Sequence, residues 1–290
     1  MDQAERLRTL IDGRGKGARV IAVASGKGGV GKTNLCLNLA IVLRQLGRRA
    51  TVVDVDIGLA NADVLLGVHS KYNLGHVLAG EISVREALTE APGGIFLLAG
   101  STGMPVVSDL GEEERTFLVQ SFRELEEQTD VLIIDTGAGI TRNVVHFAAA
   151  ADEVIVVTTP EPTAITDGYA LIKTVSREKG FGRIRLVVNQ AVNHLEAGRV
   201  SERIRMVSRR FLNLEVDDLG YVLADPRVGL SVRRKRPFVL MSPRCPASQC
   251  VRVLAERLLE DSPAAPSAFA ERLATLAPSR GARRGGGGYS

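Results

Sequence analysis

The chain has 290 residues, a formal net charge of +4, 45% hydrophobic residues and 24% charged residues, which is the balance of an ordinary globular protein. No apolar run approaches the roughly 18 residues of a membrane-spanning helix, and the first residues lack the apolar core of a signal peptide, so we expect a cytoplasmic protein. The three cysteines, Cys36, Cys245 and Cys250, lack the paired spacing of a metal site, and we interpret them as free thiols.

Residues 2–11 predict a short amphipathic helix that begins with a capping box at Asp2. A helix of about ten residues is marginal alone in water, so this one must dock on something. The glycine-rich residues 12–18 are typical of a flexible tether. We therefore predict an N-terminal arm and tether over residues 1–17, which either binds a partner or folds back on its own chain.

Residues 26–33 match the phosphate-binding pattern G-x-x-x-x-G-K-[ST]. An apolar run over 20–24 precedes the loop and a helical pattern over 34–46 follows it, which is the setting that this motif requires. Glycines let main-chain N–H groups approach a phosphate, Lys32 would reach the β- and γ-phosphates, and the Thr33 hydroxyl would ligate Mg²⁺. The predicted nucleotide-binding residues of this loop are Gly26, Lys27, Gly28, Gly29, Val30, Gly31, Lys32, Thr33 and Asn34.

The body of the chain alternates apolar strands with helical patterns. The predicted strands are 20–24, 51–55, 95–99, 131–135, 154–158, 185–189 and 220–223. The predicted helices include 34–46, 112–127, 140–150, 165–178 and 198–211. Near-continuous apolar strands joined by helices predict an α/β domain over residues 18–260, with a mostly parallel central sheet covered by helices on both faces.

Polar side chains follow three of these strands at their carboxyl ends, where such sheets bind ligands. Asp54 and Asp56 end one strand, Asp135 ends another and Asn189 ends a third. Carboxylates repel a phosphate unless a cation lies between them, so we predict Mg²⁺ held by Thr33, Asp54 and Asp135, with Asp56 orienting the attacking water. The other interpretation of Asp54 and Asp135 is that they only cap the helices that follow.

An ordinary phosphate loop does not require the charge of Lys27. The run Lys27-Gly-Gly-Val-Gly-Lys-Thr resembles the deviant Walker A loop of the MinD/ParA family of dimerising ATPases, and the segments that begin at Asp54 and Asp135 resemble its two switch regions. The resemblance covers residues 18–260. It implies a MinD-like P-loop NTPase fold of the SIMIBI class, ATP and Mg²⁺ as cofactors, and slow, switch-type hydrolysis.

The same resemblance assigns roles to individual residues. Lys27 would reach across an ATP-bound homodimer to the partner's phosphates, and Asp56 would be needed for hydrolysis, so Lys27, Lys32 and Asp56 are the predicted catalytic residues. Asn189 would read the adenine edge and Asp225 would flank the adenine. No guanine-specific Asn-Lys-x-Asp motif is present in the sequence.

Within this family, the segment from Asp2 to Arg8, D-Q-A-E-R-L-R, matches the arm of the FlhG (FleN) branch. That branch controls flagellar number and placement, and its arm stimulates the GTPase of FlhF, a signal-recognition-type partner. The resemblance implies partner-binding roles for Asp2, Gln3, Leu7 and Arg8, with Gln3 central. It also implies a flagellar transcription activator and switch-complex proteins as partners.

Two other branches remain as alternatives: a MinD-type septum-site ATPase and a ParA-type partition ATPase. MinD begins almost directly at its first strand and has no arm. The arm also argues against a ParA-like nucleic-acid partner, although the basic run over 233–236 leaves one open; a solvated loop explains that run equally. A third reading is a regulator that sequesters a transcription factor, with ATP as effector.

Residues 261–290 read as a linker and tail, with a helix predicted over 266–277. Its apolar face consists of Phe269, Leu273 and Leu276. By resemblance to the family's C-terminal membrane helix, this segment would attach the protein to the inner face of the cell membrane, at the cell pole. Its small apolar area and single arginine, Arg272, fit a solvated, weakly helical tail equally well.

Overall fold

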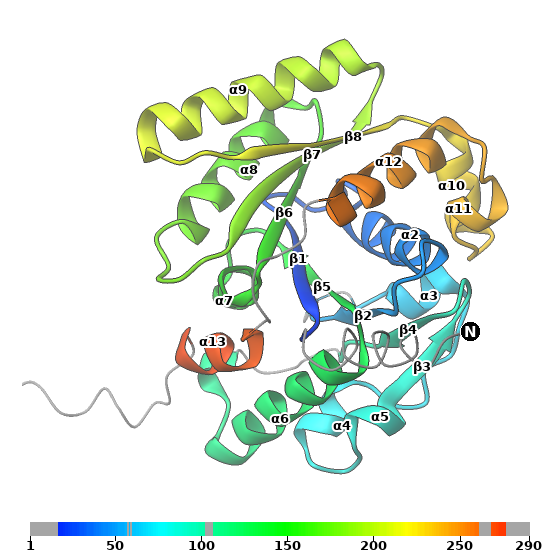
Figure 1. Ribbon diagram of the computed structural model, residues 1–290, viewed down its shortest axis with the longest axis vertical. Helices are drawn as coiled ribbons and strands as arrows, with labels where there is room; N and C mark the ends of the chain where they lie inside the picture. Colours follow the sequence, from blue (N-terminus) through cyan, green and yellow to red (C-terminus); the bar gives the residue numbers. More distant parts are fainter. Residues whose placement is uncertain (1–16, 57, 59, 102–106, 261–267, 277–290) are drawn as a thin grey trace, which may run out of the picture.

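The computed structural model describes residues 17–56, 58, 60–101, 107–260 and 268–276 (Figure 1). Its centre is an eight-stranded sheet in the order β3-β4-β2-β5-β1-β6-β7-β8. The strands are β1 Arg19–Ser25, β2 Ala50–Asp54, β3 Leu88–Ala91, β4 Ile95–Leu98, β5 Val131–Ala138, β6 Glu153–Thr158, β7 Arg183–Ala191 and β8 Asp217–Leu223. All neighbouring strands are parallel except β3, which is antiparallel to β4, so the predicted mostly parallel sheet is confirmed.

Helices cover both faces of this sheet (Figure 1). The helices are α2 Lys32–Gln45, α3 Ala62–Leu66, α4 Leu74–Leu78, α5 Val84–Ala87, α6 Glu112–Gln128, α7 Arg142–Ala150, α8 Pro162–Val175, α9 His194–Leu212, α10 Pro226–Arg233, α11 Phe238–Met241, α12 Pro246–Glu260 and α13 Phe269–Leu276, with a 3₁₀ turn at Val107–Asp109. Along β1, Val20, Ala22 and Ala24 face a core shared with α6, α7, α8, α9 and α13. Ile21 and Val23 face the opposite core, shared with α2, α11 and α12. Burial on both faces is the reason that β1 is apolar from Val20 to Ala24.

The predicted helices occur, with shifted ends that have local causes. The helix predicted over 165–178 begins earlier, because Pro162 occupies the first turn of α8, where a missing N–H costs nothing. The helix predicted over 198–211 also begins earlier, since the Asn193 side chain accepts a hydrogen bond from the Glu196 N–H and caps α9. Strand β3 and helix α12 were not among the predicted elements.

The tail helix is present as α13, but its apolar face is covered. Phe269 and Leu273 are buried, and Leu276 packs against the same core. The ring of Phe269 lies 5.0 Å from that of Phe122 on α6, measured between centroids. The interpretation of this segment as a solvated tail is therefore wrong for the arrangement described here, because its apolar face is buried. Membrane attachment by this helix stays a prediction.

Polar contacts hold α13 at the same place. Arg272 donates from Nε to the Ala150 carbonyl at 2.6 Å and from an Nη to Asp152 Oδ1 at 2.5 Å. A second ion pair joins Arg123 on α6 to Glu271 at 2.7 Å. Within the part of the chain that the structure describes, no helix is both long enough and apolar enough to cross a membrane.

Candidate nucleotide-binding site

The phosphate-binding loop connects β1 to α2 and depends on glycine at several positions. Gly29 and Gly31 have φ angles of +79° and +85°, which L-residues with side chains rarely adopt. At Gly26, a Cβ would lie 2.1 Å from the carbonyl oxygen of Asp167 on α8. The loop therefore passes directly against the backbone of α8 at Asp167, and only glycine permits that approach.

Beneath the loop, Lys32 and Asp135 form a buried ion pair. Lys32 Nζ lies 2.6 Å from Asp135 Oδ1, and the two side chains are 7% and 1% exposed. Burial alone would lower the pKa of Lys32, but the charge and hydrogen bond of Asp135, together with the charges of Cys36 and Asp56, outweigh it and the pKa is raised. The thiol of Cys36 also donates to Asp135 Oδ1, at 3.3 Å. Lys32 is thus held in its charged form, as phosphate binding requires.

The second carboxylate oxygen makes this corner suitable for a metal ion. Asp135 Oδ2 is buried and has no hydrogen-bond partner among the described residues. A buried carboxylate oxygen without a partner is costly unless something else binds it. The described residues contain no cluster of three or more acidic, histidine or cysteine side chains that could hold a metal. The observation that fits a metal ion is therefore the single oxygen Asp135 Oδ2, which could face the water shell of a Mg²⁺ that phosphates bind.

Asp54 has a structural task in addition to its predicted one. Its two carboxylate oxygens accept backbone N–H groups from Asp56 at 3.0 Å, Asn61 at 3.2 Å and Ala62 at 3.3 Å. Burial and the charge of Asp135 nevertheless raise its pKa to about 7. Asp54 therefore folds the segment after β2 back on itself, which is the capping interpretation; its role as a metal ligand stays a prediction.

That folded segment carries Asp56 toward the end of β5. Asp56 Oδ1 accepts the Gly58 N–H at 3.1 Å. The same oxygen lies 3.3 Å from the position that a Cβ would take at Gly137. The tertiary structure thus places Asp54, the last residue of β2, beside Asp135 in the neighbouring strand β5, with Asp56 close to Gly137. Asp135 lies within β5 and not at its end, because that strand continues past the predicted residue 135 to Ala138.

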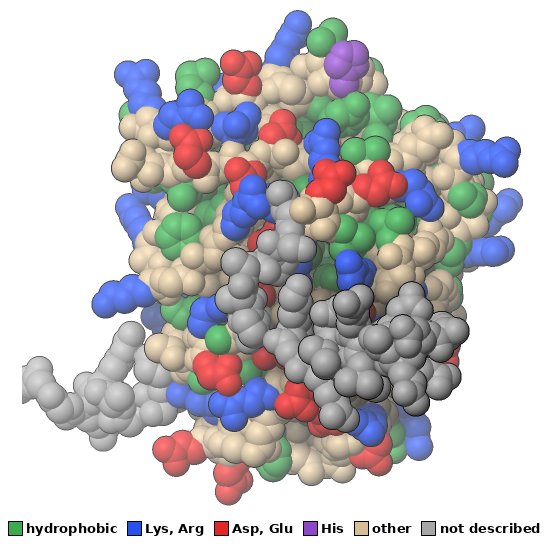
Figure 2. Space-filling model, viewed as in Figure 1, with side chains coloured by type: hydrophobic (Ala, Val, Ile, Leu, Met, Phe, Trp, Pro, Cys, Tyr) green, Lys and Arg blue, Asp and Glu red, His purple; other side chains and the backbone are tan. Residues whose placement is uncertain are grey.

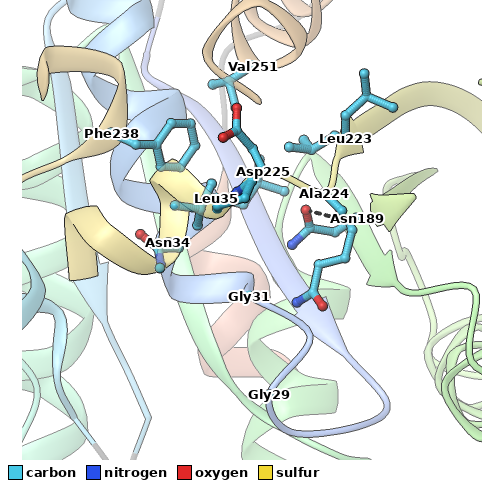
Figure 3. A pocket seen from close by; sticks show the side chains of 15 residues that line it. Gly29, Gly31, Asn34, Leu35, Asn189, Leu223, Ala224, Asp225, Phe238 and Val251 are labelled. Carbon is cyan, nitrogen blue, oxygen red and sulfur yellow. Dashed lines mark hydrogen bonds between the residues drawn. The ribbon is translucent and has the colours of Figure 1, made fainter. Parts of the chain in front are cut away.

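Beside the loop lies a cavity of about 740 Å³ (Figure 3). It is lined by Gly29, Gly31, Asn34, Leu35, Asn189, Gln190, Val222, Leu223, Ala224, Asp225, Pro226, Val228, Gly229, Phe238 and Val251. Figure 3 shows the predicted residues Asn34, Asn189 and Asp225 around it, together with the ring of Phe238. Mostly apolar walls with a few polar groups are typical of a site for a flat, polar-edged ligand.

Asn189 and Asp225 are already oriented by the chain. Asn189 donates from Nδ2 to the Val30 carbonyl at 2.7 Å and accepts the Gln190 N–H at 2.9 Å. Asp225 caps α10 by accepting the Arg227 N–H at 2.9 Å. Burial raises the pKa of Asp225, but this and other hydrogen bonds outweigh it, so the pKa lies below its usual value. Asn189 therefore ties the phosphate loop to the wall of the cavity.

A family model described as an AAA domain matches residues 18–185. The antiactivator FleN of Pseudomonas aeruginosa is 39% identical to this chain, over 83% of this chain and 86% of the FleN sequence. This chain belongs to the MinD/ParA family of P-loop ATPases.

Two further comparisons agree with this membership. The flagellum site-determining protein YlxH of Helicobacter pylori is 34% identical over 87% of this chain and 85% of its own length. The solved structure of the septum site-determining protein MinD of Pyrococcus horikoshii, complexed with Mg-ADP, superposes with a TM-score of 0.68 at 24% identity. It covers 83% of this chain and 96% of the other, and at that identity it shows the shared fold alone. The predicted MinD-like fold and FlhG-like resemblance are confirmed.

In this MinD/ParA-family chain, Lys27 is paired within its own subunit. Its Nζ lies 2.6 Å from Glu161 Oε2 and 3.0 Å from Thr163 Oγ1, at the start of α8. Sequence reasoning missed Glu161, because nothing in the local pattern around α8 marks it. It also missed Gln190 and Phe238, which line the cavity. The arm residues Asp2, Gln3, Leu7 and Arg8 lie outside the described residues.

Proposed function

We propose that this protein is a Mg-ATP-dependent, dimerising ATPase switch that regulates flagellar number and placement. The observation that carries the ATPase proposal is the buried Lys32–Asp135 pair directly beneath the phosphate loop, in which Asp135 Oδ2 has no hydrogen-bond partner among the described residues. The flagellar role rests on the similarity to FleN and YlxH. That FleN is named an antiactivator supports a transcription activator among the partners.

The proposed chemistry uses few side chains. Lys32 turns from Asp135 to the β- and γ-phosphates of ATP, as a compact charge at the amino end of α2. Thr33, Asp135 and Asp54 would hold the Mg²⁺ ion and its bound water. When bound, Mg²⁺ supplies positive charge against the phosphates. Asp56 orients the attacking water, and Lys27 of the partner subunit stabilises charge on the transferred phosphoryl group.

The cavity beside the loop would take the adenosine half of the nucleotide. Asn189 would offer its amide to the adenine edge, and Asp225 would lie alongside. An adenine edge presents both a donor and an acceptor, which a carboxamide can match. We therefore propose ATP rather than GTP as substrate, and expect Asn189→Ala to reduce the ratio of ATP to GTP affinity.

We further propose that the arm stimulates an FlhF-type GTPase, with Gln3 ordering the attacking water. A peptide of residues 1–17 or the full chain should raise the partner's GTP hydrolysis, and Gln3→Ala should remove the effect while binding persists. Switch-complex proteins are proposed as further partners. Attachment to the cell membrane, at the pole, would require α13 to leave its site, because its apolar face is buried.

A septum-site or partition ATPase is the alternative, since the MinD fold is shared by those proteins. ParA-type function predicts strong ATP-dependent DNA binding with a steep salt dependence. We favour the flagellar function over both, because the arm matches the flagellar branch. A filter-binding assay for DNA at two salt concentrations separates the flagellar function from the partition function.

The central test is the solution mass of the Asp56→Ala variant, measured by light scattering with Mg-ADP and then with Mg-ATP. We expect a monomer with ADP and a dimer with ATP, because hydrolysis no longer dissolves the dimer. Lys27→Ala in the same background should remain monomeric. An Asp56→Ala protein that stays monomeric with ATP would refute the switch mechanism.

A further inference from the structure

Cys36 is placed one helical turn after Lys32 on α2, and its side chain is completely buried. Residues four apart on a helix share a face, so Cys36 and Lys32 approach the same partner. That partner is Asp135, whose Oδ1 accepts from Lys32 Nζ at 2.6 Å and from Cys36 Sγ at 3.3 Å. Both donors therefore meet one carboxylate oxygen.

The other oxygen, Oδ2, has no partner among the described residues. The two oxygens of a carboxylate share a plane, so fixing one also fixes the direction of the other. In the present arrangement Lys32 and Cys36 together set the rotation of Asp135. When Lys32 turns to a nucleotide, the thiol is the side-chain donor that stays with Oδ1.

We propose that Cys36 is a positioning residue for Asp135. Its S–H donates to Oδ1 and so keeps Oδ2 directed to the water shell of the nucleotide-bound Mg²⁺. The inference rests on the Mg-nucleotide site proposed above. It gives the buried thiol a task that the phosphate-loop motif does not include, since that motif ends at Thr33.

The competing explanation is that Cys36 only fills space, because a buried cysteine behaves as a small hydrophobic residue. Substitutions separate the two. Cys36→Val keeps an apolar side chain and loses the donor, whereas Cys36→Ser keeps a donor and loses apolar character. Space filling predicts that Val is better tolerated than Ser, and positioning predicts the reverse for any property that depends on Mg²⁺.

The experiment measures the affinity of a fluorescent N-methylanthraniloyl-ADP for the full chain, once with MgCl₂ and once with EDTA. We call the dissociation constant in EDTA divided by that in MgCl₂ the Mg²⁺ effect; it is the factor by which Mg²⁺ tightens binding. We expect Cys36→Ala and Cys36→Val to reduce this ratio roughly three- to tenfold, the size of one lost hydrogen bond of ordinary strength, because a thiol is a weak donor; the EDTA value should be unchanged. Cys36→Ser should stay within about twofold of the unsubstituted protein.

Cys250→Ala serves as the matched control, because Cys250 lies on α12, is only half-buried and makes no hydrogen bond to Asp135 within the described residues. Thermal unfolding of each variant checks that it is folded. A full Mg²⁺ effect in Cys36→Val, or a reduction in Cys36→Ser as large as in Cys36→Ala, would overturn the inference. If the unsubstituted chain binds the probe with no Mg²⁺ effect at all, the proposed metal site is itself wrong. That result is distinct, because it appears before any substitution is made.

Discussion

Lys27 Nζ lies 2.6 Å from Glu161 Oε2, although the two residues are 134 positions apart in the chain. Glu161 occupies the N-cap position of α8 without a capping hydrogen bond from its side chain, and a negative charge is favoured at this end of a helix. In the described subunit the signature lysine of the family is therefore engaged in cis. To act on the phosphates of a second subunit, it must first leave Glu161.

Removing this cis partner should favour the dimer. The pair is open to solvent, with side chains 39% and 63% exposed, so its contribution is small. We expect Glu161→Gln to tighten ATP-dependent dimerisation by about two- to fivefold, measured by sedimentation at several protein concentrations. Thr163→Ala, which removes the second acceptor, is the milder comparison. A weaker dimer in Glu161→Gln would mean that Glu161 has a task within the dimer instead.

The two glycines that flank Lys27 should respond differently to alanine. At Gly26, the new Cβ would meet backbone at 2.1 Å, whereas at Gly28 the nearest atom is 3.9 Å away. We expect Gly26→Ala to lower the free energy of unfolding by about 1–3 kcal/mol or to displace the loop, and Gly28→Ala to change it by less than about 0.5 kcal/mol. Urea unfolding without nucleotide measures both. Equal losses would show that the loop does not press on α8 as described.

Removing either aromatic ring of the contact between α6 and α13 should release α13. Phe122 on α6 and Phe269 on α13 are both fully buried, with centroids 5.0 Å apart. Phe122→Ala should weaken docking while leaving the apolar face of α13 intact, and Phe269→Ala should weaken docking while removing part of that face. If the helix binds lipid, flotation with anionic vesicles should increase in Phe122→Ala and increase less in Phe269→Ala. No increase in either, with helix release shown by faster amide exchange, would contradict membrane binding by this segment.

Docking of α13 should also depend on pH through Glu126 on α6. Burial raises its pKa from the ordinary 4.5 to about 7, although the N–H groups of Ala270 and Phe269 donate to it; the charges of Glu271 and Asp152 raise the pKa further. Between about pH 4.5 and 7, Glu126 therefore keeps its proton when α13 is docked and loses it when α13 is released. As a result, docking is strongest below about pH 4.5 and weakens as the pH rises through about 7.

Amide hydrogen exchange over residues 269–276 at pH 6 and pH 8 tests this, after correction for the intrinsic pH dependence of exchange. We expect less protection at pH 8. In Glu126→Gln, which is neutral at both pH values, the difference should disappear while protection at pH 6 is kept. Equal protection of the unsubstituted chain at the two pH values would show that Glu126 does not control docking.

Much of the fold and of the site follows from local signals. The apolar runs that became β1, β5, β6 and β7 are buried on both faces, so their composition alone marks them. The edge strand β3, with the sequence Leu-Thr-Glu-Ala and one buried residue, carries no such signal. Helix α11 starts at Phe238 and is only four residues long, which is too short for a helical periodicity to show in the sequence. The ring of Phe238 in the wall of the cavity could therefore not be predicted.

The sequence by itself determined the phosphate loop, the parallel sheet and the acidic strand ends, because glycine spacing, strand composition and strand polarity act over a few neighbouring residues. Only the tertiary structure decided that Lys27 pairs with Glu161, that Cys36 and Lys32 share one oxygen of Asp135, and that α13 is docked between α6 and α7. Most of these contacts join residues about 100 or more positions apart. No local periodicity encodes them, since they depend on how the finished layers pack against one another.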